Sequence, residues 1–287
     1  MIIDSHCHAW PYWPYLPEVP DPETRGSVEM LLSQMDLNGV DRATIVCAQI
    51  FQNFGNNDYV AAAVRKFSDR LDQFADVDSF WSETYHITGA AARLEQAAKK
   101  WPMKGFTHYV AAEDDAAWFD SQDGRDFFGV ANSARLIASI ACGPQHQPAI
   151  RKVAERYPGL TVLCHHMSGL RAYGDDARQK MDLVLPSAEL PNVHLKLSGF
   201  HYVSPPESSW DFPYGDARWV YEECYAAFGR RMAWGSDYPV VTRAMTHRQS
   251  LEAFRTHCSF VSEDDREAIL GGTLESLLHK ARDVMSQ

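Results

Sequence analysis

Short runs of apolar and β-branched residues alternate along the chain with longer segments whose apolar residues lie three or four positions apart. The first pattern is typical of strands and the second of amphipathic helices. Eight runs fit strands: Ile2–Cys7, Ala43–Gln49, Gln73–Asp78, Gly105–Val110, Leu136–Cys142, Thr161–His165, Val193–Leu197 and Met232–Trp234. Helical spacing marks Val28–Leu37, Tyr59–Ser68, Ala90–Lys100, Ala149–Tyr157 and Trp219–Phe228. Strict alternation of strands and helices predicts an α/β fold, a closed (β/α)8 TIM barrel.

The rival architecture is an open, doubly wound sheet, which commonly binds a dinucleotide. No GxGxxG motif follows any of the predicted strands, so the sequence gives that alternative no nucleotide site. Helix stop signals at Asn38-Gly39 and Pro158-Gly159 fall where a barrel needs them. Since 287 residues suit one barrel of ~250 residues with a tail, and no linker interrupts the pattern, we expect a single domain over residues 1–287.

Charge and composition narrow the class of ligand. The formal net charge of -11 argues against nucleic acid and anionic membranes as partners, because both need a basic face. A small-molecule substrate is the remaining expectation. No apolar run approaches the ~20 residues of a membrane span, no signal peptide opens the chain, and the six cysteines form no CxxC pair. These features predict a cytoplasmic protein, and they leave open whether it forms a homo-oligomer.

Two long loops rich in proline and aromatic residues follow predicted strands, over Ala9–Arg25 and Tyr202–Asp216. In a barrel they would stand over the carboxyl-terminal mouth, where substrates bind. On that interpretation Trp13 and Trp210 contact the substrate. The alternative is that both loops are surface segments held by aromatic packing.

Polar side chains gather where the predicted strands end. His6 and His8 are two apart on one strand, so both imidazoles face the barrel interior and can bind one divalent metal. The alternative is a pair of histidines satisfied by hydrogen bonds. Asp237 follows the last strand, and by itself it fits a helix N-cap equally well. Together with His166, these residues form a credible set for binding zinc or manganese and for activating water.

Three segments of the sequence resemble those of a known family. DSHCH, VLCHHMSG and WGSDYP look like segments of the amidohydrolase-2 branch of the metal-dependent hydrolase superfamily. The segment KGFTHYVAAEDDAAWF resembles one found in lactonase-like members, those similar to fuconolactonases and 2-pyrone-4,6-dicarboxylate lactonase. GGTLESLL resembles the closing helix of the family, so the likeness runs from Met1 to about Leu278.

The resemblance implies roles for particular residues. His6, His8 and His166 match the histidines of the first and sixth strands, and Asp237 matches the aspartate that takes a proton from the attacking water. These four residues are the implied catalytic and metal set, with zinc as the first choice of ion. His165 is assigned to the surroundings of that set. His108 matches a substrate-binding histidine, although Thr107 stands where relatives carry arginine.

A second departure concerns the metal. Many zinc-dependent relatives place a histidine after the fifth strand, where this chain has Cys142, which is interpreted as a buried thiol rather than a ligand. Some lactonase-like members resemble this pattern and are thought to work without a metal, so a metal-free site stays open. Arg171 and Gln145 are candidates for substrate binding, Arg171 through a substrate carboxylate. A surface salt bridge is the alternative role for Arg171.

These observations predict a hydrolase that opens a small lactone, derived from a sugar acid or from aromatic-ring breakdown, by attack of water on the ring carbonyl. The first alternative is a decarboxylase or hydratase of the same branch. The second is a binding protein without catalytic activity, which would have no need of both strand histidines and Asp237.

Overall fold

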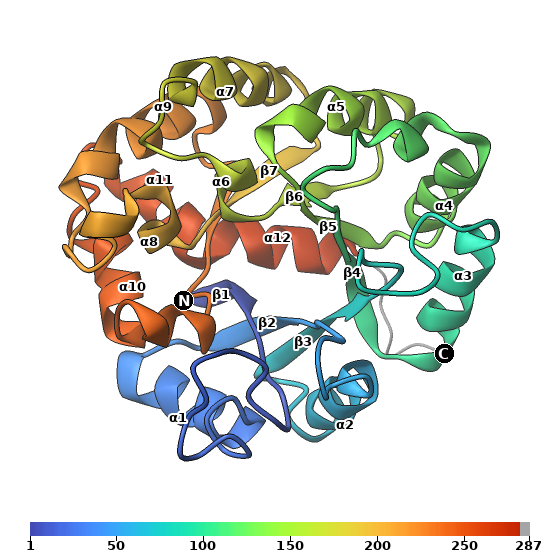
Figure 1. Cartoon of the computed structure of the whole chain (residues 1–287), viewed down its shortest axis with the longest axis horizontal. Coiled ribbons are helices and arrows are strands. Elements are labelled where there is room, and N and C mark those ends of the chain that lie inside the picture. The colour runs from blue at the N-terminus through green and yellow to red at the C-terminus, as the bar shows by residue number, and fades with distance from the viewer. Residues whose placement is uncertain (282–287) are drawn as a thin grey trace.

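Eight parallel strands form the centre of the computed structural model, which describes residues 1–281. Each strand pairs in parallel with the next along the chain, and helices surround them (Figure 1). The predicted (β/α)8 barrel is therefore confirmed, with strand bounds that differ from the predicted ones by up to three residues. The strands are β1 (Ile3–Cys7), β2 (Arg42–Val46), β3 (Leu71–Asp76), β4 (Met103–Tyr109), β5 (Ile137–Ala141), β6 (Val162–Cys164), β7 (Val193–Leu197) and β8 (Met232–Trp234).

Helical segments follow every strand. The sequence pattern did not single out the helix after β4, whose interior carries two glycines at positions 124 and 129 that weaken the helical signal. The helices are α1 (Val28–Asn38), α2 (Asn56–Lys66), α3 (Ala90–Lys100), α4 (Gln122–Ser133), α5 (Gln147–Arg156), α6 (His166–Gly169), α7 (Ala177–Val184), α8 (Phe200–Val203), α9 (Arg218–Phe228), α10 (His247–Arg255), α11 (Glu263–Glu267) and α12 (Thr273–Lys280).

The amino-terminal end of the barrel is filled by apolar side chains. Leu274 and Leu278 of α12 pack with Ile3 and Ile137, the first residues of β1 and β5, and with Phe74. In Figure 1, α12 crosses the middle of the ring of outer helices. This cluster supports the structure at one end, and the polar residues are left to the other.

A bulge in β1 turns its histidines into the barrel. Asp4 pairs with Ala43 and Cys7 with Ile45, so three steps along β1 match two along β2. The extra residue changes which side chains face inward. Ile3 can therefore lie in the interior cluster while His6, three positions later, also points inside.

The carboxylate of Asp4 joins the first strand to the segment after the last one. Its Oδ1 accepts hydrogen bonds from the backbone N–H of His6 at 3.0 Å and of Ser236 at 2.9 Å. Gly235 lies so close to β1 that a Cβ there would come within 2.6 Å of the Cβ of His6. The barrel is thus closed where the chemistry-bearing residues lie.

The ends of the chain bear on two of the predictions. The domain predicted over residues 1–287 includes residues 282–287, which lie outside the described part of the chain. Within residues 1–281, none of the helices combines the length and the apolar character needed to cross a membrane.

Loss of the Asp4 carboxylate should destabilise the fold. Asp4→Ala leaves two buried N–H groups without an acceptor, and each such group costs about 1–3 kcal/mol. We expect the free energy of unfolding in urea to fall by about 2–6 kcal/mol. Asp41→Ala is the matched control, because that exposed carboxylate accepts one backbone N–H, from Ile2. Equal losses in the two variants would contradict the role given to Asp4.

Candidate active site

A cavity of about 540 Å³ opens at the carboxyl-terminal end of the barrel, a volume typical of sites for small molecules. It is bounded by residues that follow β1, β4, β5, β6 and β8 and by the loop after β7. Its lining residues are His8, Tyr15, Tyr109, Val110, Ala112, Ala141, Cys142, Gly143, Pro144, Gln145, His146, His165, His166, Gly169, Arg171, Lys180, Tyr202, Asp237 and Val240.

Three imidazoles converge on one carboxylate oxygen at the floor of this cavity. Asp237 Oδ1 lies 3.5 Å from His6 Nε2, 3.4 Å from His8 Nε2 and 4.0 Å from His166 Nε2. The two strand histidines are 3.2 Å apart at Nε2. The four residues predicted from sequence are therefore neighbours in the fold.

The backbone that presents His166 and Asp237 is in an uncommon conformation. His166, Met167 and Ser168 all have positive φ angles, of 45°, 51° and 58°, in the tight turn labelled α6. Asp237 has a φ of 59°, and its N–H donates to the carbonyl of His6 at 2.7 Å. Non-glycine residues in this region cost about 1–3 kcal/mol each and cluster at functional sites.

Glycine is required beside that turn. Gly199, with a φ of 67°, follows β7, and a Cβ there would come within 2.8 Å of His166 Nδ1 and would also overlap the ring of Tyr202. His166 Nδ1 in turn pairs with Ser198 Oγ at 2.9 Å, which leaves its Nε2 facing Asp237. The end of β7 thus sets the orientation of the sixth-strand histidine.

The arrangement of donor atoms fits a divalent ion. His8 Nδ1 donates to the carbonyl of Val46 at 2.7 Å, so its Nε2 presents a lone pair to the site. Bonds of ~2.1 Å at a tetrahedral angle place ligand atoms about 3.4 Å apart. The separations among His6, His8 and Asp237 lie close to that value. Two overlapping groups in the described residues have this capacity, His6 with His8 and Asp237, and His6 with His165 and His166.

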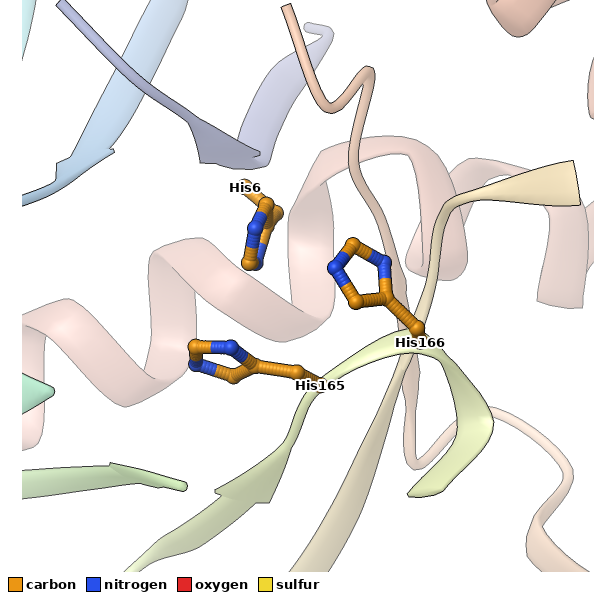
Figure 2. A group of neighbouring side chains, drawn as sticks. All are labelled: His6, His165 and His166. Carbon is orange, nitrogen blue, oxygen red and sulfur yellow. The ribbon is translucent and has the colours of Figure 1, made fainter. Parts of the chain in front are cut away.

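Figure 2 shows the second of these groups, with the rings of His6, His165 and His166 turned toward one another. His6 differs from His8 because its Nδ1 faces the amine of Lys196 at 3.3 Å. When Lys196 donates there, the ring hydrogen of His6 lies on Nε2 and points toward Asp237 in the absence of an ion. An ion bound at that atom takes the place of the hydrogen, so the same residues suit a site with or without metal.

Burial governs the charges in the cluster. It lowers the pKa of His166 to about 4, and burial followed by the nearby Lys196 lowers the pKa of His6 well below its ordinary value. Burial alone would raise the pKa of Asp237, but His166 and His8 hold it below its ordinary value. At neutral pH the neutral imidazoles of His6 and His166 therefore face an ionised carboxylate, which is the state needed both to bind a metal and to accept a proton.

Sequence reasoning missed two residues of the site. Tyr202 donates its hydroxyl hydrogen to Asp237 Oδ2 at 2.8 Å. Lys196 is fully buried inside the barrel, where burial lowers its pKa to about 7. The sequence held a signal for Lys196, namely a lysine within an apolar strand. A lysine is almost never fully buried unless it has a partner.

His108 does not line the cavity, contrary to the substrate-binding role inferred for it. Side chains alternate along β4, and Tyr109 faces the cavity, so His108 points outward with Phe106. The rings of His108 and Phe106 both pack on Phe127 of α4. His108 is fully buried and its Nε2 pairs with His86 at 3.3 Å, which makes it part of the packing between the barrel and its helices.

The two tryptophans chosen from the aromatic loops also lie away from the cavity. Trp13 is buried beside a separate hollow lined by its own loop and by Phe51 and Gln52, and Trp210 is 69% exposed beside a third hollow. Tyr15 and Tyr202 line the cavity instead. The loops do reach the mouth of the barrel, but through tyrosines and not through the tryptophans.

Arg171 and Gln145 do line the cavity. Arg171 donates to the carbonyl of Tyr202, and no ion pair to it is found among the described residues, which leaves donors for a ligand. Contact with Cys164, followed by burial, raises the pKa of the Cys142 thiol well above its ordinary value. This agrees with interpreting Cys142 as a thiol and not as a metal-binding thiolate.

Comparison with known proteins adds three findings. The model of the amidohydrolase family matches residues 3–279. L-fucono-1,5-lactonase from Burkholderia ambifaria is 25% identical over 283 residues, which cover 94% of this chain and 92% of the relative. A crystal structure of an amidohydrolase from Burkholderia multivorans with bound zinc superposes with a TM-score of 0.77 and 18% identity, over 97% of this chain and 99% of the other.

A second solved structure is a probable 2-pyrone-4,6-dicarboxylic acid hydrolase from Acinetobacter baumannii with citric acid bound. It superposes with a TM-score of 0.74 and 19% identity, over 97% of this chain and 99% of the other. Two 5-carboxyvanillate decarboxylases share the fold at TM-scores of 0.65 and 0.66. At these identities the solved structures establish the fold.

We expect the purified protein to carry up to one divalent ion per chain, because the donor atoms of His6, His8 and Asp237 converge on one point. Elemental analysis measures the content. His8→Gln removes one donor and should abolish retention of the ion, whereas His108→Gln, a buried histidine outside the set, should leave the content unchanged. Protein that holds no metal and keeps full activity in a chelator would support the metal-free form of the site.

Proposed function

This chain belongs to the amidohydrolase family, and on that premise we propose that it is a hydrolase that opens a small lactone by attack of water on the ring carbonyl. The observation that carries the proposal is the buried carboxylate of Asp237, kept ionised and facing three imidazoles at the floor of a cavity. Similarity to L-fucono-1,5-lactonase along 94% of this chain supports a lactone as substrate.

In the proposed reaction Asp237 accepts a proton from the water as the oxygen attacks the carbonyl carbon. Its two oxygens have different surroundings, since Oδ2 accepts the hydroxyl hydrogen of Tyr202 and Oδ1 faces the imidazoles. Tyr202 therefore fixes the orientation of the carboxylate. His166 holds the water beside Oδ1. The ester C–O bond then breaks, the leaving oxygen takes the proton from Asp237 to become a hydroxyl, and the product is a hydroxy acid.

A divalent ion fits the residues His6, His8 and Asp237, with zinc as the first choice. When bound, it would supply Lewis-acid polarisation of an oxygen and lower the pKa of water. The roles of the other residues of the site do not depend on the ion. These residues bind the substrate, orient the carboxylate and exclude bulk water from the floor of the cavity.

The substrate proposed for this site is a small lactone that carries a carboxylate or several hydroxyls. The guanidinium of Arg171 has donors directed at the cavity and suits a carboxylate. Gln145, which is exposed at the mouth, suits a hydroxyl or carbonyl group. Sugar-acid lactones and products of aromatic-ring breakdown both have this chemistry.

Decarboxylation is the alternative reaction, because decarboxylases share the fold. The two reactions leave different products. Ring opening releases a proton and no gas, whereas decarboxylation releases carbon dioxide. Assays of both on L-fucono-1,5-lactone, 2-pyrone-4,6-dicarboxylate and 5-carboxyvanillate separate the two enzymes, and no turnover of any of them would favour a binding protein.

Asp237→Asn keeps the shape of the side chain and removes its basic oxygen. General-base catalysis contributes about 10²–10⁴ in rate, so kcat for lactone opening should fall by at least about 10²-fold while the protein stays folded. Asp126→Asn, an exposed carboxylate on the outer face of α4, is the matched control. A kcat above about a tenth of the wild-type value would exclude Asp237 as the base. Metal content is measured alongside, because the same carboxylate fits the ion.

Arg171→Met tests recognition of a substrate carboxylate. A charged hydrogen bond contributes about 1.5–3 kcal/mol, so KM for a carboxylate-bearing lactone should rise by about 10- to 150-fold, with little change for a neutral lactone. Arg178→Met is the control, because that arginine stacks on Trp219 and pairs with Glu223 outside the cavity. Equal losses with charged and neutral lactones would show that Arg171 acts by supporting Tyr202.

A further inference from the structure

We propose that His165 donates a hydrogen bond from its Nδ1 to the carbonyl oxygen of the substrate, and that Lys196 and Ser139 fix the imidazole in the tautomer that carries this hydrogen. The inference rests on the proposed lactone hydrolysis. It adds the group that stabilises the negative charge formed on the carbonyl oxygen when water attacks.

A network of buried polar groups crosses the barrel interior. Lys196 Nζ on β7 lies 2.8 Å from Ser139 Oγ on β5, and Ser139 Oγ lies 2.7 Å from His165 Nε2 at the end of β6. All three side chains are buried, with exposures of 0%, 0% and 2%. Lys196 and Ser139 have no access to bulk water, and His165 Nε2 faces Ser139, so the hydrogen bonds within this network decide where each hydrogen lies.

The direction of these bonds follows from the lysine. Lys196 Nζ carries hydrogens to donate in both its charged and its neutral form, and it lies within hydrogen-bond distance of Ser139 Oγ. Lys196 therefore donates to Ser139, and the serine hydroxyl donates its own hydrogen onward to His165 Nε2. A neutral imidazole that accepts at Nε2 carries its hydrogen on Nδ1.

The Nδ1 atom of His165 is buried and has no hydrogen-bond partner among the described residues. An unpaired buried N–H costs about 1–3 kcal/mol, which a substrate oxygen would recover. The ring lies against the site, 4.5 Å from the ring of His6 between centroids, and it lines the cavity. Figure 2 shows it turned toward His6 and His166.

The chemistry of this atom selects its ligand. A neutral N–H is a donor, so it pairs with an acceptor such as a carbonyl oxygen, and it does not coordinate a metal through the same nitrogen. Of the two groups of metal-ligating residues, the structure then favours His6, His8 and Asp237 over His6, His165 and His166. A fixed donor in a site that excludes water is the arrangement that stabilises an oxyanion.

The tautomer is measured directly by NMR of protein labelled with ¹⁵N in its histidines. Comparison with His165→Asn assigns the His165 signals among the 12 histidines. We expect hydrogen on Nδ1 in the wild type. Ser139→Ala interrupts the hydrogen-bond network without changing a residue that lines the cavity, and it should give a mixture of tautomers. Hydrogen on Nε2 of wild-type His165, or an unchanged spectrum in Ser139→Ala, would overturn the assignment.

The donor role is tested with two variants of His165. Asn places an amide N–H close to the position of Nδ1, whereas Leu fills a similar volume without a donor. Loss of one oxyanion donor costs about 10²–10³ in kcat, so His165→Leu should lose at least about 10²-fold with little change in KM, and His165→Asn should keep within about tenfold of the wild type. Equal kcat values for the two variants would refute the donor role.

Binding of an unreactive ligand tests this inference separately from the proposed function. If the wild type opens no lactone, the proposed function fails, and binding of δ-valerolactam, an unreactive cyclic amide, still decides the inference. The Nδ1 hydrogen of His165 should then shift downfield in the complex. An unshifted signal with bound lactam would overturn the donor contact even in an active lactonase.

Discussion

The carboxylate of Asp4 carries the constraint on which the site depends. It holds the backbone of His6 on the first strand and of Ser236 beyond the last, two positions separated by 230 residues of chain. Asp237 follows directly and donates its own N–H to the carbonyl of His6. The same contacts therefore close the barrel and bring Asp237 to the histidines of the first strand. A carboxylate that bonds to backbone is well suited to this task, because every residue type except proline offers the same backbone N–H.

The sequence predicted the fold and the central residues for simple reasons. Strand and helix periodicities depend on local geometry, so eight alternations sufficed to indicate a barrel and the structure confirmed it. His6, His8, His166 and Asp237 came from strand ends, and parallel strands in a barrel bring their carboxyl ends together. The resemblance to amidohydrolases implied their roles, and the match of the family model to residues 3–279 confirms the resemblance.

Other parts of the site depended on facts that local patterns do not contain. The side of β4 from which His108 projects is set by register, and a shift of one residue reverses it. Choosing Tyr15 and Tyr202 instead of Trp13 and Trp210 would have required knowing the path of the long loops. Lys196 is visible in the sequence as a lysine within an apolar strand, but its partners come from β1 and β5, more than 50 residues away. Such long-range pairing is what the three-dimensional structure adds.

The apolar packing of α12 fills the amino-terminal end of the barrel, and the cavity that contains Asp237 opens at the opposite end. On the proposed chemistry, the lactone enters and the hydroxy acid leaves through the same mouth, past the same tyrosines and Arg171. The product carries a newly formed carboxylate that the lactone lacked, and the guanidinium attracts it. When substrate and product use the same opening, the rate of turnover depends on release of the product. On the proposed chemistry, the loops at the mouth therefore affect the rate as well as the choice of substrate.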